Sequence, residues 1–155
     1  MSGPDPAPGN DRREEAAAFL RSLPHARELG MELLEAGDGT ATIALPYDAR
    51  FVGDPATGVL HGGVVTALLD STCGAAVLLH PAMTGSATAT LDLRIDYLRP
   101  APAGMRVTAR ADCFRVTRTV AFVRATAWTT AAEEPVATAA GAFTAGEPRA
   151  GTAPR

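Results

Sequence analysis

A chain of 155 residues with 46% apolar and 20% charged residues has the composition of one globular domain. The net charge is −3 and all 14 basic residues are arginines, so a general attraction to nucleic acid or to an anionic membrane is excluded. Cys73 and Cys113 are not in a C-x-x-C spacing. We therefore expect a cytoplasmic protein with two buried thiols rather than a disulfide framework.

The two ends of the chain differ from its middle in composition. The proline-rich, charged stretch 1–10 predicts a disordered lead-in rather than a secretory signal, and residues 147–155 predict a disordered tail. Residues 11–146 are expected to form a single domain. Its first element is predicted as a short helix from Asp11 to Leu23, with acids in the first turn and Pro24 ending it.

Two strands are predicted next, because the sequence Gly-Asp-Gly at 37–39 is typical of a hairpin turn. In the second strand Ala41, Ile43 and Leu45 occupy alternate positions, as a half-buried strand requires. A loop is expected to follow from Asp48 to Val59.

The segment from Gly62 to Leu79 predicts one long helix. It is apolar on nearly its whole circumference, so it must be buried on most of its sides. Its length would also suit one membrane span. However, it carries Asp70 in its middle, follows His61 and lacks a basic flank, so we expect no membrane.

The rest of the chain alternates between apolar and polar residues, which predicts four strands with one covered face each. They are "LDLRIDY" (91–97), "MRVTARADC" (105–113), "TVAFVRATAW" (119–128) and "VATAAGAF" (136–143). The chain order of one short helix, two strands, a long helix and four strands predicts an α+β fold. Specifically, we expect the hotdog arrangement, an antiparallel sheet of about six strands wrapped around the long helix. No internal repeat or metal-ligand cluster is found.

Asp70 is the only charged residue between Gly62 and Leu79. Burying an unpaired carboxylate costs several kcal/mol, so the acid needs partners or a function. One interpretation is a structural acid that meets an arginine or a backbone amide. The other is a catalytic group.

Gly62 and Gly63 favour the catalytic interpretation. At a helix start the backbone N–H groups lack intrahelical partners, and glycine lets a substrate oxygen approach them, although Gly63 could also serve close packing. Asp70 lies eight residues beyond Gly62, about 12 Å along one helix, so one small carbonyl cannot touch both. Two antiparallel copies of the helix would bring Gly62 of one chain towards Asp70 of the other. The sequence therefore predicts at least a dimer.

The stretches "GVLHGGVVTALLD" (58–70) and "LDLRIDYLRPA" (91–101) resemble the hotdog-fold thioesterases of the PaaI type, and the resemblance extends over residues 30–145. It implies hydrolysis of acyl-CoA thioesters by a homodimer or a dimer of dimers. No cofactor is implied, because coenzyme A is part of the substrate. It further implies that the Gly62 amide polarises the thioester carbonyl while Asp70 acts as general base or nucleophile.

Three further positions are implied by the same resemblance. His61 would either bond near the thioester or merely cap the helix. Many members carry an asparagine six residues before this histidine, but this chain has Pro55 there. Either a neighbour or an ordered water replaces it, or the mechanism depends more strongly on Asp70. A family hydroxyl maps to Thr90, which strand parity puts on the side of Asp92, away from Leu91.

Coenzyme A needs cations for its phosphates. Arg115 and Arg118 lie three residues apart in the predicted turn "CFRVTRT", and Arg99 lies in "YLRP", just after the predicted strand 91–97. These three arginines are the candidate phosphate ligands.

Two alternatives stay open at this point. A hydratase or dehydratase of the same fold would need a histidine in the loop before "GVL", where Ala49 and Arg50 stand. A non-catalytic acyl-CoA-binding protein would not need a buried acid. The residues expected to line an acyl pocket do not select a chain length; they are Ala67, Leu68 and Leu69 with Ala121 and Ala125.

Overall fold

The structure is a computed structural model that describes residues 8–129 and 134–146. The helices are α1 (Pro8–Ser22), α2 (Pro24–Glu28) and α3 (Gly62–Leu79), with short 3-10 turns at Ala49–Phe51 and Pro81–Met83. The strands are β1 (Glu32–Gly37), β2 (Thr40–Leu45), β3 (Val52–Asp54), β4 (Val59–Leu60), β5 (Thr90–Tyr97), β6 (Val107–Val116), β7 (Val120–Thr129) and β8 (Ala137–Thr144). Residues 1–7 of the predicted lead-in and the predicted tail lie outside the described residues.

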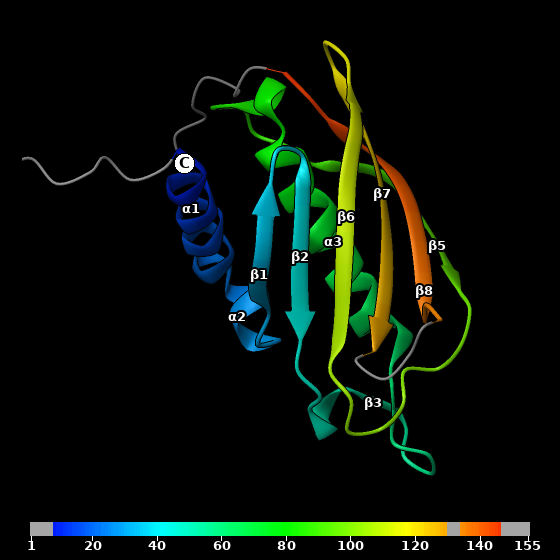
Figure 1. Ribbon diagram of the computed structural model, residues 1–155. Helices are drawn as coiled ribbons and strands as arrows, with labels where there is room; N and C mark the ends of the chain where they lie inside the picture. The colour runs from blue at the N-terminus through cyan, green and yellow to red at the C-terminus, as the bar shows by residue number, and fades with distance from the viewer. Residues whose placement is uncertain (1–7, 130–133, 147–155) are drawn as a thin grey trace, which may run out of the picture.

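Six strands form one antiparallel sheet in the order β1-β2-β6-β7-β8-β5. The sheet curls around α3, while α1 lies beside β1 at the edge opposite β5 (Figure 1). The predicted α+β hotdog fold is confirmed, including both ends of the long helix.

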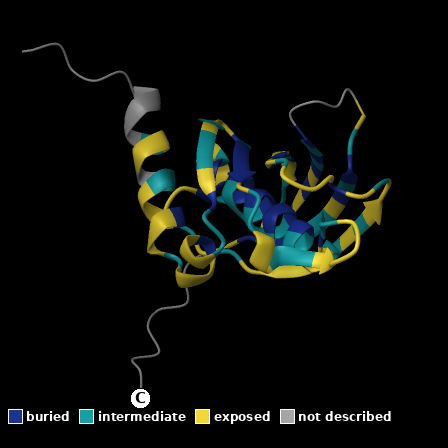
Figure 2. Cartoon of the chain, turned by 90° about the horizontal axis from the view of Figure 1, so that it is seen from below, coloured by how far each residue is buried: buried dark blue, intermediate teal, exposed yellow. Residues whose placement is uncertain are grey.

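The core lies between α3 and the concave face of the sheet, as the dark residues in Figure 2 illustrate. Leu68 and Leu69 of α3 are fully buried, which contributes about 1.5–3 kcal/mol each to stability. Small residues on the inner face of β6 and β7 let the helix approach closely; Ala109, Ala111, Ala121 and Ala127 are all buried.

Helix α3 is long and apolar enough to cross a membrane, judged by length and composition alone. In this structure it is the central helix of the domain, and eight of its 18 residues are buried against the sheet and its neighbours. Its apolar character is accounted for by that packing.

The first helix begins earlier and ends differently from the prediction. Helix α1 starts at Pro8 rather than Asp11, because a helix tolerates proline in its first turn, where the missing N–H would have no partner. Pro24 ends α1 as expected but also opens α2 for the same reason. Arg12 fastens α1 to the domain by donating to Asp38 Oδ1 at 2.9 Å and to the Leu79 carbonyl at 2.6 Å.

Candidate active site

The segment before α3 contains two short strands where a loop was predicted. Strands β3 and β4 form a small hairpin there, and the His61 N–H donates to the Phe51 carbonyl at 2.8 Å. Gly53 of β3 packs directly on His61, since a Cβ at Gly53 would lie 2.8 Å from the His61 Cα. The hairpin therefore fixes where α3 begins.

His61 caps α3. Its Nδ1 accepts from the Gly63 N–H at 2.9 Å, so the neutral ring carries its proton on Nε2. Of the two backbone amides predicted to be free, those of Gly62 and Gly63, one is therefore already bonded. The Gly63 N–H is occupied by His61, whereas no acceptor for the Gly62 N–H lies among the described residues.

Tyr97 is a residue of this region that the sequence interpretation missed. Its hydroxyl donates to the Gly62 carbonyl at 2.9 Å and also bonds the Thr66 hydroxyl, and its ring lies 3.4 Å from where a Gly62 Cβ would be. The register places Tyr97 opposite buried Ala137, on the face of β5 towards α3. Its side chain is nevertheless 52% exposed, because β5 is an edge strand.

A cavity of about 350 Å³ opens at Gly62. Its walls include Leu60, Gly62, Val65, Tyr97, Arg99 and Ala101. Of the three predicted phosphate ligands, Arg99 is the one that lies in this cavity. Its guanidinium bonds the backbone carbonyls of Glu134 and Pro135, the latter at 3.3 Å, which holds the side chain in position.

Asp70 is half-buried on α3, and the Thr90 hydroxyl donates to its Oδ1 at 2.8 Å. Strand parity predicted that Thr90 would point away from the helix, and this prediction was wrong. A β-bulge between Thr90 and Asp92 sets Thr90 opposite Phe143 and Asp92 opposite Ala142, so Thr90 shares the inner face with buried Phe143. Oδ2 of Asp70 has no partner in the described part of the chain, which leaves it free to accept from water.

Cys73 lies three residues beyond Asp70 and is fully buried. Burial, with a smaller contribution from the Asp70 charge, raises the pKa of its thiol to about 12. A thiol that stays protonated at neutral pH is a poor nucleophile, so Cys73 is not a candidate nucleophile.

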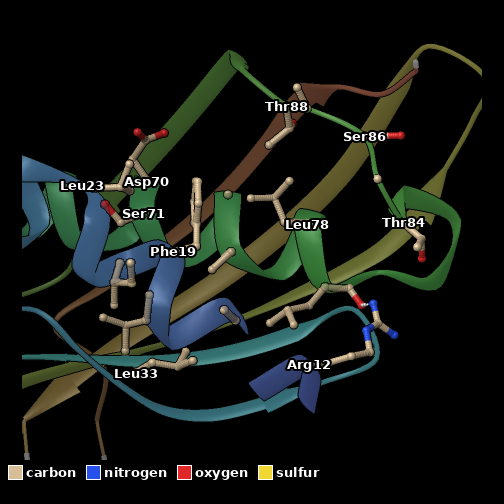
Figure 3. A pocket seen from close by; sticks show the side chains of 18 residues that line it. Arg12, Phe19, Leu23, Leu33, Asp70, Ser71, Leu78, Thr84, Ser86 and Thr88 are labelled. Atoms are coloured by element: carbon tan, nitrogen blue, oxygen red, sulfur yellow. Dashed lines mark hydrogen bonds between the residues drawn. The ribbon is translucent and has the colours of Figure 1, made fainter. Parts of the chain in front are cut away.

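Asp70 lines a second, larger cavity of about 590 Å³ between α1 and α3 (Figure 3). Its apolar walls come from both helices and from β1 and β2; they include Ala16, Phe19, Leu23, Leu33, Ala75 and Leu78. The residues predicted to line an acyl pocket are not among them. Leu68, Leu69 and Ala121 are fully buried core residues, because the sheet closes over that side of α3.

The two cavities share no lining residue, so one chain holds Gly62 and Asp70 in separate hollows. Arg115 and Arg118 are exposed at the β6–β7 turn, where the Thr119 carbonyl accepts from Ala145 beyond β8. This turn lies at the end of the sheet remote from β3 and the start of α3 (Figure 1). The structure therefore does not bring Arg115 and Arg118 to the Gly62 of their own chain.

Pro55 is exposed in the β3–β4 turn. The neighbouring Asp54 accepts from the Ala56 N–H at 3.0 Å and from the Thr57 hydroxyl at 2.7 Å, and these bonds lower the pKa of Asp54. Both polar neighbours of Pro55 are thus bonded to each other within the turn.

The family model described as Thioesterase superfamily matches residues 57–135, a range that includes both Gly62 and Asp70. The chain belongs to this superfamily. It is 34% identical over 118 residues to the medium/long-chain acyl-CoA thioesterase YigI of Escherichia coli K12, covering 68% of this chain and 76% of the relative. The predicted thioesterase identity is confirmed, and the chain is a thioester hydrolase.

Solved structures share the fold of this chain. A Pseudomonas aeruginosa protein is 38% identical, with a TM-score of 0.76 over 86% of this chain and 98% of that one. The E. coli PaaI protein from the phenylacetic acid degradation operon has a TM-score of 0.79 at 21% identity, over 90% of this chain and 96% of that one, which supports the fold alone. The resemblance to PaaI-type proteins therefore holds in fold, while membership of the thioesterase superfamily rests on the family model and on YigI.

Proposed function

We propose that this thioesterase hydrolyses acyl-CoA in a site shared by two copies of the chain. The Gly62 N–H of one copy polarises the thioester carbonyl, and Asp70 of the other copy acts as general base on water or as nucleophile. The acyl-CoA specificity of YigI supports the substrate class. The proposed site also accounts for a carboxylate on the most apolar helix of the chain.

The observation that carries this proposal is the separation of the two groups. Within one chain they lie about 12 Å apart along α3, and each lines a different cavity. In the described part of the chain the Gly62 N–H has no acceptor and Asp70 Oδ2 has no donor, and neither residue lines the cavity of the other. Each cavity therefore holds one of the two groups that acyl transfer needs, the oxyanion donor or the base.

The general-base route uses the groups as they stand. A water oxygen attacks the thioester carbonyl carbon while its proton passes to Asp70 Oδ2, and the Gly62 N–H bonds the developing oxyanion. Collapse of the tetrahedral intermediate breaks the C–S bond and releases the coenzyme A thiolate, which takes up a proton. In the nucleophilic route Asp70 attacks the carbonyl, and water then hydrolyses the mixed anhydride.

The edge of the sheet supports pairing of two copies. In the described part of the chain no strand lies against the outer edge of β5. Leu91, Tyr97 and Leu98 at this edge are 58%, 52% and 55% exposed. A long edge strand with exposed apolar side chains is suited to pairing with another chain.

Replacing Asp70 by asparagine tests the proposal. Asp70→Asn keeps the size and the acceptor for Thr90 but removes the charge, so turnover of acyl-CoA should fall by orders of magnitude while the fold survives. The matched control is Asp112→Asn, which removes a carboxylate paired with Arg124 on the outer sheet face. Near wild-type hydrolysis by folded Asp70→Asn would contradict the proposal.

A further inference from the structure

The larger cavity begins at the proposed catalytic acid and runs along α3. Asp70 and Ser71 lie at one end of it and Arg12 at the other, with Phe19 and Leu78 between them (Figure 3). The middle is apolar on both sides, since α1 supplies one wall and α3 the facing wall. Such a volume, about 590 Å³, is within the usual range of small-molecule sites.

The far end of the cavity carries a charged side chain. Arg12 donates to the Leu79 carbonyl and to Asp38, so α1 is fastened across the end of α3 at this point. Thr84 and Ser86 of the segment after α3 line the cavity on the same side (Figure 3). An apolar chain that reached this end would meet the guanidinium that these bonds hold in position.

The distance between the two ends of the cavity corresponds to an acyl chain of defined length. Asp70 and Leu79 are nine residues apart on α3, or roughly 13 Å. An extended chain advances about 1.2 Å per bond, so this length takes about eleven bonds. The match is to an acyl group of about ten to twelve carbons.

We infer that the cavity between α1 and α3 holds the acyl tail, and that helix α1 limits the substrate to medium chain length. This inference rests on the proposed function, because it starts from a thioester held at Asp70. It gives α1 a direct part in specificity, as the wall and far end of the acyl site.

Two leucine substitutions at different depths in the cavity test how far the acyl tail extends into it. Ala75→Leu fills the cavity five residues beyond Asp70, about 7 Å along α3, and Ala16→Leu fills it from α1, one turn from Arg12. The matched control is Ala18→Leu, the same change on the same helix at an exposed residue outside the cavity. The measurement is kcat/KM for acyl-CoA from butyryl to palmitoyl, with thermal unfolding to confirm the fold.

We expect the wild type to prefer decanoyl- or dodecanoyl-CoA and to lose activity at palmitoyl. Ala16→Leu should lower kcat/KM for dodecanoyl-CoA at least tenfold with butyryl-CoA unchanged within about twofold, and Ala75→Leu should move the limit to still shorter chains. Ala18→Leu should keep the wild-type profile. Since the two cavity variants lie on different helices, either one that folds is sufficient for the test.

The outcomes separate the two claims. If the wild type hydrolyses acyl-CoA but both cavity variants keep its chain-length profile, the acyl site is elsewhere and only this inference is overturned. An equal loss for all chain lengths also overturns it. If the wild type hydrolyses no acyl-CoA of any length, the proposed function is wrong and the inference is wrong with it.

Discussion

Replacing Thr90 by valine removes the hydroxyl that donates to Asp70 Oδ1 at 2.8 Å while keeping a β-branched side chain suited to a strand. A hydrogen bond to a charged group is worth about 1.5–3 kcal/mol, and the exposure of Thr90 favours the lower value. Because in the proposed site this bond orients the carboxylate for proton transfer at Oδ2, we expect kcat to fall by roughly tenfold, the equivalent of about 1.4 kcal/mol. The assay is release of coenzyme A thiol at saturating acyl-CoA.

Thr90→Ser is the matched variant, because it keeps the hydroxyl and loses only a methyl group. It should retain most of the wild-type turnover. If Thr90→Val hydrolyses acyl-CoA at the wild-type rate, the bond to Asp70 has no part in catalysis. If both variants lose activity equally, the methyl packing rather than the hydroxyl is responsible.

Three further variants test other parts of the structure. Tyr97→Phe removes the hydroxyl bonded to Gly62, so the free energy of unfolding should fall by about 1 kcal/mol with a lower kcat; an unchanged melting temperature and rate would refute this. Arg118→Ala should raise KM for acyl-CoA, more at low salt than at high, and leave a pantetheine thioester without nucleotide phosphates unaffected; equal effects on both substrates, or none, would refute a phosphate contact. Burial raises the pKa of Cys73 to about 12, and this shift stabilises the fold fully below pH 9. From pH 9 towards 12 only the unfolded chain loses the thiol proton. The free energy of unfolding should therefore fall by about 1.4 kcal/mol per pH unit over that range. Denaturant titrations of Cys73→Ala should lack that part of the slope, and an identical slope in both proteins would contradict the burial argument.

The sequence predicts those elements whose pattern is local and strong. The Gly-Asp-Gly turn at 37–39 predicts the β1–β2 hairpin, and the unbroken apolar run predicts α3 from Gly62 to Leu79 with both ends correct. Asp70 stands out within that run because a charge in an apolar helix needs an explanation. These features depend on a few neighbouring residues, so they are readable without tertiary contacts.

The parts that were missed depend on contacts between distant segments. The bulge at Thr90 depends on the pairing of β5 with β8, and it reverses the face that alternation alone assigns. The docking of α1 onto α3 depends on Arg12 reaching Asp38 and the Leu79 carbonyl, 26 and 67 residues away in the chain. The exposure of Tyr97 follows from the place of β5 at the sheet edge, which no local pattern contains.

Mixing two inactive variants tests most directly whether the site is shared between subunits. Gly62→Pro removes the helix-start amide at a position where proline is tolerated, and the preceding residue, His61, already has the extended backbone that proline requires, with φ −63° and ψ 134°. It is combined with Asp70→Asn, each variant being inactive alone. A heterodimer then contains one intact pair, Asp70 from the first variant with Gly62 from the second. We expect purified heterodimers to recover about half of the wild-type activity, as two-fold symmetry with one intact site of two requires. Folded heterodimers with no activity above either parent would contradict the shared site.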